Sequence, residues 1–325
     1  MDIKGNEESK SIWVADVGGT SIKLAIIKQR NILERTEIPA EADRGLLPAL
    51  DRMSIAWRDM SRRCGATEAD CAMVGLAFPG IIDPIDERIW TTPAGKFDDS
   101  RKLDVREWCR KNLARPITIC NDANAALAGE WQYGVARGCQ NVCMMTLGTG
   151  VGTAVVVEGR PLRGRHGLAG NAGGHLTIDI HGIECLCGNI GCVESEGSSW
   201  AMQRQAEAHP SLAGSALAKE RRLDYEAVFR LAKQGDALAQ ELLDRSLRAW
   251  ATGAVNMVNS YDPDMLILGG GVMKSADIII PYIREYLRRH AWAQWEVPVV
   301  PAESGNDAGL FGIAYLASRQ VNEGK

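Results

Sequence analysis

The chain alternates between short apolar runs and longer amphipathic stretches. Eight runs of four to seven mostly apolar residues are followed closely by glycine, proline or a polar residue, a pattern that favours buried strands. The predicted strands span residues 12–16, 22–27, 71–77, 117–120, 142–147, 154–157, 265–268 and 297–300. We therefore expect an α/β protein.

Apolar residues at helical spacing mark the segments between these runs. Leu46, Leu50, Met53 and Trp57 predict an amphipathic helix over residues 44–62, and its aromatic and methionine positions are those of a core face rather than of cofactor contacts. Further helices are expected at residues 123–133, from about 198, after the capping positions 224 and 236, and at 308–319.

Two strand–turn–strand units divide the chain. The first turn contains Gly18, Gly19 and Thr20, and the second, at residues 148–152, reads Gly-Thr-Gly-Val-Gly about 130 residues later. Adjacent glycines let backbone N–H groups approach an anion closely. A plain hairpin is the alternative, but Asp16 at the end of the first strand suits a magnesium-bound nucleotide. The repetition predicts a duplicated α/β domain with a nucleotide between the halves.

Two other strand ends carry candidate site residues. Gly80 ends a Phe-Pro-Gly break after the strand at 71–77, and open α/β sheets bind ligands at the carboxyl ends of strands. Asn121 and Asp122 lie between the strand at 117–120 and a helix, whose dipole would keep a carboxylate charged. The alternative is that one of them is simply an N-cap, which is the commoner role.

A cysteine-rich loop indicates a metal site. Cys185, Cys187 and Cys192 lie within eight residues, and two glycines after Cys187 permit tight turns. Three thiolates and one imidazole form a closed, structural zinc site, with either His175 or His181 as the nitrogen ligand. Buried inert thiols are the alternative. A disulfide is disfavoured because we find no secretory segment.

The totals restrict the classes of function. A chain of 325 residues is long enough for two domains, and 46% hydrophobic with 24% charged residues is typical of a soluble globular protein. A net charge of −4 without a basic run argues against nucleic acid as the main partner. No apolar run is long enough to cross a membrane, and the first ten residues are polar, so we expect a cytoplasmic protein.

Eight short motifs occur in the order found in the ROK sugar kinases, which the chain resembles from about residue 12 to Leu316. They are Asp16-Val-Gly-Gly-Thr20, Ala77-Phe-Pro-Gly80, Asn121-Asp122-Ala-Asn124, Gly148-Thr-Gly-Val-Gly152, Gly174-His175, Cys185-x-Cys187-Gly-x-x-Gly-Cys192-x-Glu194, Gly269-Gly-Gly-Val272 and Asp307-Ala-Gly-Leu-Phe-Gly312. Their order, together with the cysteine loop, makes the resemblance specific.

This resemblance implies a duplicated actin-like ATPase (ribonuclease H-like) fold, with two α/β lobes and the active site in the cleft. We expect an N-terminal lobe at residues 11–121, with helix 307–319 packing back on it, and a C-terminal lobe at 122–306 that carries the zinc loop. The resemblance also implies transfer of the γ-phosphate of ATP to a sugar hydroxyl, usually on carbon 6, and commonly a homodimer.

The resemblance assigns roles to individual positions. Asp122 would be the general base. Sugar contacts would come from Gly80, Asn121, His175 and Glu194. The phosphates of ATP and Mg²⁺ would be held by Asp16, Gly18, Gly19, Thr20, Lys23, Gly148, Thr149, Gly150 and Gly152, and the adenosine would lie near Gly270 and Gly271. A structural Zn²⁺ would bind His175, Cys185, Cys187 and Cys192.

One position departs from the family. Its members usually have Glu three residues before the zinc-binding His, where it grips hydroxyls at carbons 1 and 2. Here that position is Ala172, preceded by Asn171. We expect both residues to line the sugar site and to alter its specificity. Either Asn171 replaces the carboxylate and gives a glucose kinase with a poor KM, or the gap accepts a modified or epimeric hexose, which we favour.

Two alternatives are not enzymes. Some family members are sugar-responsive transcription regulators, but about ten residues precede the first predicted strand, too few for a helix-turn-helix unit. A catalytically silent sugar-binding protein is disfavoured because both glycine turns and Asp122 are present.

Overall fold

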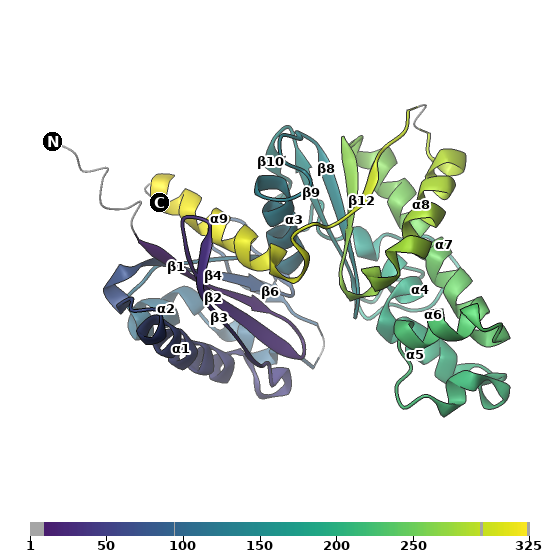
Figure 1. Cartoon of the computed structure of the whole chain (residues 1–325), viewed down its shortest axis with the longest axis horizontal. Helices are drawn as coiled ribbons and strands as arrows, with labels where there is room; N and C mark the ends of the chain where they lie inside the picture. Colours follow the sequence, from purple (N-terminus) through teal and green to yellow (C-terminus); the bar gives the residue numbers. More distant parts are fainter. Residues whose placement is uncertain (1–9, 94, 293–294, 324–325) are drawn as a thin grey trace. The chain divides into compact units, whose positions relative to one another are not determined.

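The structure is a computed structural model that describes residues 10–93, 95–292 and 295–323. These residues form two compact units (Figure 1). The first comprises the chain up to Gly138, the short segment Arg163–Ala169 and the chain from Asn306 onwards. The second comprises Cys139–Leu162 and Gly170–Gly305.

A five-stranded sheet organises the first unit. Its order is β3 (Asn31–Pro39), β2 (Ser21–Lys28), β1 (Ser11–Val17), β4 (Cys71–Phe78) and β7 (Ile117–Asn121). Strand β2 is antiparallel to both neighbours, whereas β1, β4 and β7 run parallel. The carboxyl ends of the parallel strands therefore lie at one edge of the sheet, with Asp16 opposite Ala77 and Phe78 opposite Asn121.

Helices cover both faces of this sheet because successive side chains along a strand point to opposite sides. The helices of the first unit are α1 (Leu46–Arg63), α2 (Val105–Leu113), α3 (Asp122–Gln132) and α9 (Ala308–Glu323). Trp13 and Ala15 of β1 share a core with α1 and α2, whereas Val14 shares one with α3 and α9. Strands β5 (Ile81–Ile82) and β6 (Ile89–Thr91) form a small separate hairpin.

A second five-stranded sheet repeats the first in topology. Its order is β10 (Arg160–Pro161), β9 (Val151–Val157), β8 (Val142–Leu147), β11 (Met265–Gly269) and β12 (Val299–Pro301). Strand β9 is antiparallel to both neighbours, and β8, β11 and β12 run parallel. The duplicated actin-like ATPase fold expected from the sequence is confirmed.

One face of the second sheet buries a large apolar cluster. The helices of this unit are α4 (Val193–Gly197), α5 (Ser199–Ala208), α6 (Tyr225–Lys233), α7 (Ala237–Tyr261) and α8 (Ala276–His290). Met145 and Leu147 of β8 pack in the same cluster as Trp250 and Met257 of α7. Among the described residues, no helix combines the length and the apolar composition that a membrane span requires.

The structure differs from the expected organisation in two respects. The eight predicted strands are present with shifted ends, but β3, α2 and α8 were not predicted from the sequence. The compact first unit extends to Gly138 and includes α3, whereas we expected the lobe boundary at residues 121–122. Helix α3 belongs there because it packs closely along α9, which also lies in the first unit.

Candidate functional site

Three carboxylates gather near the carboxyl-terminal edge of the first sheet. Asp16 lies near the end of β1, Asp122 begins α3 directly after β7, and Asp307 immediately precedes α9. The carboxylate of Asp16 lies 3.9 Å from Nζ of Lys23 on the adjacent strand. That of Asp307 accepts a hydrogen bond of 3.0 Å from Arg35. Asp16 and Asp307 thus each have a cationic side chain as a neighbour.

Burial and mutual repulsion perturb these acids. Burial raises the pKa of Asp16 to about 6; the charge on Asp122 adds to the rise, Lys23 opposes it, and Asp307 adds a smaller contribution. Burial also raises the pKa of Asp122, although the backbone N–H of Ala123 acts in the opposite direction. A bound cation would relieve this repulsion, and carboxylates are the ligands that Mg²⁺ prefers. This edge is therefore suited to a magnesium ion.

Asn121 fixes the geometry around Asp122. Its side-chain oxygen accepts hydrogen bonds from the N–H groups of Ala123 and Asn124, at 2.8 and 3.3 Å, and so caps α3. Its amide nitrogen donates a 3.0 Å bond to the carbonyl of Gly80. Asn121 is thus an N-cap, the alternative that the sequence left open, and at the same time it ties the loop after β4 to the start of α3.

Gly80 occupies a position where a side chain does not fit. A Cβ atom there would lie 2.2 Å from the carbonyl oxygen of Thr91 on the neighbouring hairpin. The glycine is therefore required for close packing of the loop, whether or not its backbone also contacts a ligand.

The first glycine turn is closed by a hydrogen bond and flanked by a lysine. The N–H of Gly18 donates to the carbonyl of Ser21 at 2.9 Å, while Gly19 and Thr20 are exposed. A Cβ on Gly19 would lie 2.6 Å from Nζ of Lys96. An ammonium group beside exposed turn N–H groups favours a phosphate. Lys96 was missed from the sequence because it belongs to no recognisable motif.

The second glycine turn holds a carboxylate of its own unit. Oε2 of Glu194 accepts a 2.9 Å hydrogen bond from the N–H of Val151, and a Cβ on Gly150 would lie 2.5 Å from that oxygen. The indole N–H of Trp200 donates to Oε1 of Glu194 at 3.4 Å. The backbone N–H of Trp200 donates to the carbonyl of Thr149. The turn, Glu194 and Trp200 therefore form one connected group, of which Trp200 was not anticipated.

Gly148 and Gly152 of the second glycine turn lie next to Gly270 and Gly271, the glycines expected near the adenosine. The N–H of Gly148 donates to the carbonyl of Gly150 at 3.0 Å, and Gly152 pairs with Thr146 within the sheet. Gly270 follows β11 with a φ of 92° and would place a Cβ 2.3 Å from the carbonyl oxygen of Leu147. Gly271 has open space around it. The open space at Gly271 leaves room for a flat group beside the turn.

The cysteine loop gathers four metal-binding side chains. The ligand atoms of His175, Cys185, Cys187 and Cys192 all lie within 4.8 Å of one another. Nδ1 of His175 lies 3.6 Å from Sγ of Cys185. His181 does not belong to this group, so the structure selects His175 among the two histidines.

The loop backbone explains how the cysteines converge. The N–H of Cys185 donates to the carbonyl of Asn189 at 2.8 Å, which closes a tight turn around Gly188 with its φ of 88°. Gly191 has a φ of 62° and would place a Cβ 1.7 Å from the carbonyl oxygen of Asp179. The amide of Asn189 also donates to the carbonyl of His175 at 3.1 Å. Glycine is therefore required at both positions.

The donor atoms and the protonation of these thiols bear on the metal that the loop would bind. Burial raises the pKa of Cys185 to about 11 and raises that of Cys192 further, so both thiols are neutral without a metal ion. Three sulfur donors and one imidazole nitrogen are the ligand set of a structural zinc site, and a zinc ion deprotonates such thiols on binding. The donor set thus fits Zn²⁺.

The segment before His175 is held against β9. Thr153 Oγ1 accepts from the N–H of Gly173 at 2.8 Å and donates to the carbonyl of Gly170 at 2.9 Å. The carbonyl of Ala172 accepts from the N–H of His175 at 2.9 Å. Ala172 is thereby fixed one short turn from the metal-binding ring.

The predicted residues form one group in the first unit and two groups in the second. In the first unit the structure brings together Asp16, Gly18, Gly19, Thr20, Lys23, Gly80, Asn121 and Asp122 at one edge of the sheet. In the second it brings together the 148–152 turn with Glu194, and His175 with the three cysteines.

A model of the ROK family matches residues 13–320, nearly the whole chain. A glucokinase from Halalkalibacterium halodurans is 31% identical, with 94% of each chain covered. An N-acetylmannosamine kinase from Vibrio cholerae is 27% identical, covering 92% of this chain and 96% of its own.

A solved structure shows the same fold. A ROK family glucokinase from Streptomyces griseus, crystallised in complex with glucose and AMPPNP, superposes with a TM-score of 0.79. It is 27% identical in sequence, and the alignment covers 95% of this chain and 99% of that one.

Proposed function

The chain belongs to the ROK family and is a sugar kinase, and we propose that it transfers the γ-phosphate of ATP to the 6-hydroxyl of a hexose or hexose derivative, with Asp122 as general base. The observation that carries this proposal is the position of Asp122, at the end of β7 and the start of α3, beside Asp16. Both the glucokinase and the N-acetylmannosamine kinase relatives are named as sugar kinases.

The proposed role of Asp122 follows from the nature of phosphoryl transfer. The transition state is loose, so catalysis depends mainly on positioning and on neutralising charge. Asp122 needs to accept the hydroxyl proton only late in the reaction, and a carboxylate is adequate for this. Asn121 holds the start of α3 in place and thereby orients Asp122.

Nucleotide binding is assigned to the two glycine turns. Asp16 would help to hold magnesium, which would supply neutralisation of the charge that develops during transfer. Asp16 and Lys23 lie beside the first turn, and Lys96 approaches Gly19, so this unit offers a carboxylate for the metal and two ammonium groups for phosphate. The 148–152 turn and Gly270–Gly271 would receive the rest of the nucleotide.

Zinc is assigned a structural role near the sugar. His175 binds a metal through one ring nitrogen and can offer the other N–H to a sugar hydroxyl. The loop would thus orient His175, while Glu194, held by Val151 and Trp200, contributes a second group. We assign sugar contacts to these two residues and to Gly80 and Asn121.

The identity of the sugar depends on residues 171 and 172. Ala172 occupies the position at which the family resemblance leads us to expect Glu, and its side chain cannot accept a hydrogen bond, whereas Asn171 offers an amide one residue earlier. This supports a modified or epimeric hexose over glucose, because a site that leaves hydroxyls unpaired discriminates against that sugar.

A coupled assay across hexoses, amino sugars and acylamino sugars tests the proposed reaction. We expect magnesium-dependent ADP release with one sugar class, and ³¹P NMR of the product should show phosphorus coupled to the two protons on carbon 6. Phosphorus coupled to the single anomeric proton would refute the 6-hydroxyl assignment. Absence of turnover with every sugar, despite binding, would favour a regulatory protein.

Two further properties complete the proposal. We propose a homodimer, as the family resemblance implies, and a cytoplasmic location, as expected from the sequence. Light scattering coupled to size-exclusion chromatography at micromolar concentration would detect the dimer, and a mass near the 35.3 kDa of one chain would contradict it.

A further inference from the structure

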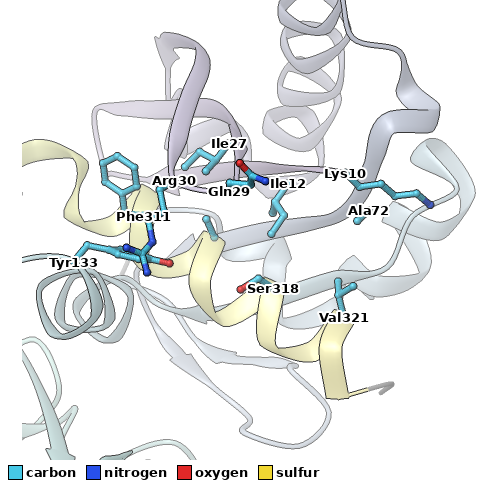
Figure 2. Close-up of a pocket in the computed structure, with 11 residues that line it drawn as sticks. Lys10, Ile12, Ile27, Gln29, Arg30, Ala72, Tyr133, Phe311, Ser318 and Val321 are labelled. Carbon is cyan, nitrogen blue, oxygen red and sulfur yellow. The ribbon is translucent and has the colours of Figure 1, made fainter. Parts of the chain in front are cut away.

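The first unit contains a pocket at the sheet edge opposite the carboxylates. It has a volume of about 290 Å³ (Figure 2). Ile12 and Ala72 come from the amino-terminal ends of β1 and β4, whereas Asp16 and Asn121 lie at the carboxyl-terminal ends of the parallel strands. The pocket is therefore separate from the candidate nucleotide and sugar residues.

Helix α9, three strands and two connecting segments build this pocket. One wall is a single face of α9, with Phe311, Ala314, Ser318 and Val321 at spacings of three and four residues. The rest of the lining comes from β1, β2 and β4, the turn at residues 29–30 between β2 and β3, and the residue that follows α3. The apolar lining side chains come mainly from the strands and from α9.

The ionisable side chains of the lining carry positive charge or none. They are Lys10, Arg30 and Tyr133, and none of the described residues that line the pocket is acidic. Burial raises the pKa of Tyr133, so its hydroxyl is neutral at physiological pH. Figure 2 shows Arg30 and Tyr133 at one end of the pocket and Lys10 towards the other, with apolar side chains between them. The lining is thus complementary to an anion with an apolar body.

Arg30 is preorganised for such a ligand. Its guanidinium lies over the Tyr133 ring, 5.3 Å from the ring centroid. A cation–π contact uses the charge of the guanidinium and not its hydrogen-bond donors, so the N–H groups of Arg30 can bind an anion. A guanidinium pairs with phosphate or carboxylate through two parallel hydrogen bonds.

The elements that form the pocket also carry the candidate catalytic residues. Helix α3 runs from Asp122 to Gln132, about 16 Å at 1.5 Å per residue, and the pocket residue Tyr133 follows it directly. Helix α9 runs from beside Asp16, where a Cβ on Gly309 would lie 2.9 Å from a carboxylate oxygen, to the pocket wall. A small shift of either helix would therefore move groups at both ends.

We propose that this pocket is an effector site for a small organic phosphate, held by Arg30 and coupled to the sugar kinase site through α3 and α9. A volume near the lower end for ligand sites limits the effector to the size of a small metabolite. The binding part of this proposal does not depend on the reaction assigned to the protein, whereas the coupling part rests on it.

Calorimetry with phenyl phosphate tests the binding part. The full chain is first saturated with a non-hydrolysable ATP analogue, so that the probe cannot occupy the nucleotide site. We expect saturable binding, weakened about tenfold or more by Arg30→Gln, because a charge-assisted pair is lost. Lys28→Gln removes the same charge from the end of β2, outside the lining, and should change affinity by less than about twofold.

Three outcomes would overturn the binding part: no saturable binding, equal affinity of the wild type and Arg30→Gln, or an equal loss in the Lys28→Gln control. Ser318→Leu provides a second variant, since it fills the pocket from α9 without changing charge and should also weaken binding. Inorganic phosphate alone should bind more weakly than phenyl phosphate, because it leaves the apolar lining unfilled.

Sugar titrations test the coupling. With phenyl phosphate at saturation, the Kd of the best sugar should change by at least about twofold, and the sugar should change the Kd of phenyl phosphate by the same factor. Arg30→Gln should abolish this dependence while the sugar still binds. Binding of phenyl phosphate that leaves the sugar Kd unchanged would refute an effector role.

Discussion

Asp122 combines helix-terminal placement with a perturbed carboxyl group. Asp122→Asn should lower kcat by about 10²-fold or more while leaving sugar affinity nearly unchanged, because the amide cannot accept the hydroxyl proton. Stopped assays with calorimetry on the same preparation would separate the two effects.

Asp224→Asn is the matched control for this substitution. Asp224 also stands at the start of a helix, where it accepts a 3.0 Å bond from Ala227, but it belongs to the second unit and to no predicted site. Its substitution should leave kcat unaltered. Near wild-type turnover in Asp122→Asn would exclude Asp122 as the base.

Asp16 should make the metal-free protein less stable as the pH rises. Its pKa is about 6 in the folded protein and 3.8 in an ordinary environment. Between these values the folded state holds more protons than the unfolded state, so the free energy of unfolding falls as pH increases. The full effect is up to about 3 kcal/mol, from 1.36 kcal/mol per pKa unit.

Asp16→Asn should therefore stabilise the magnesium-free protein, and by more at pH 7.5 than at pH 5. Urea unfolding in the presence of EDTA would measure this difference. The same variant should bind ATP with magnesium more weakly. Equal stabilisation at both pH values would show that the carboxyl group titrates normally.

Ala172 should control the choice of sugar. Ala172→Glu supplies a charged acceptor, and a hydrogen bond to a charged group contributes ~1.5–3 kcal/mol. We expect kcat/KM to rise by about tenfold or more on glucose and to fall on the best alternative sugar. Asn171→Glu places the same charge one residue away and shows which position faces the substrate. Unchanged preference in both variants would place neither residue in the sugar site.

At the scale of elements, close contact between α3 and α9 supports the first unit. A Cβ on Gly312 would lie 1.7 Å from the carbonyl oxygen of Ala125, and one on Gly129 would lie 2.2 Å from that of Ala308. Gly312→Ala should therefore cost roughly 1–3 kcal/mol or more, because backbone atoms must separate. Gly214→Ala, where nothing lies within 4 Å, is the control. Equal unfolding midpoints for Gly312→Ala and Gly214→Ala would contradict the proposed role of close α3–α9 contact.

The cysteine loop should depend on its metal ion. Elemental analysis should find about one zinc per chain, and Cys187→Ser should lower the zinc content and weaken sugar binding, since metal binding orders the ligating segment. Cys64→Ser, in the first unit and outside the loop, should retain zinc. A zinc-free preparation with full activity would refute the structural role.

The sequence predicted the strands that carry a strong apolar run and missed the weakly patterned β3, although the amphipathic helices α2 and α8 were also missed. Strands β1 and β4 are almost entirely buried, so their sequences are apolar runs that could be recognised as strands. Strand β3 alternates between exposed and half-buried residues and lies at the edge of its sheet, so it carries few apolar residues. Lys96 and Trp200 were missed because they contact turns that are distant in sequence, at Gly19 and Thr149.

At the scale of the whole molecule, the sequence predicted the duplication. It did not predict correctly which elements belong to each unit. The two glycine turns repeat, and the two sheets repeat their strand order. The place of α3 in the first unit depends on packing against α9, whose sequence lies almost two hundred residues later. Local patterns do not contain that information, which explains the displaced boundary.

The discontinuity of the first unit has a consequence for biosynthesis. Its five strands emerge from the ribosome early, but α9, which covers Val14, Ala77 and Cys120 together with α3, is translated last. At 5–20 residues per second, on the order of ten to thirty seconds separate Gly138 from Ala308. During that interval one apolar face of the nascent sheet lacks its cover, so it presents a binding surface for chaperones, and the unit completes its folding only after the second unit has been synthesised.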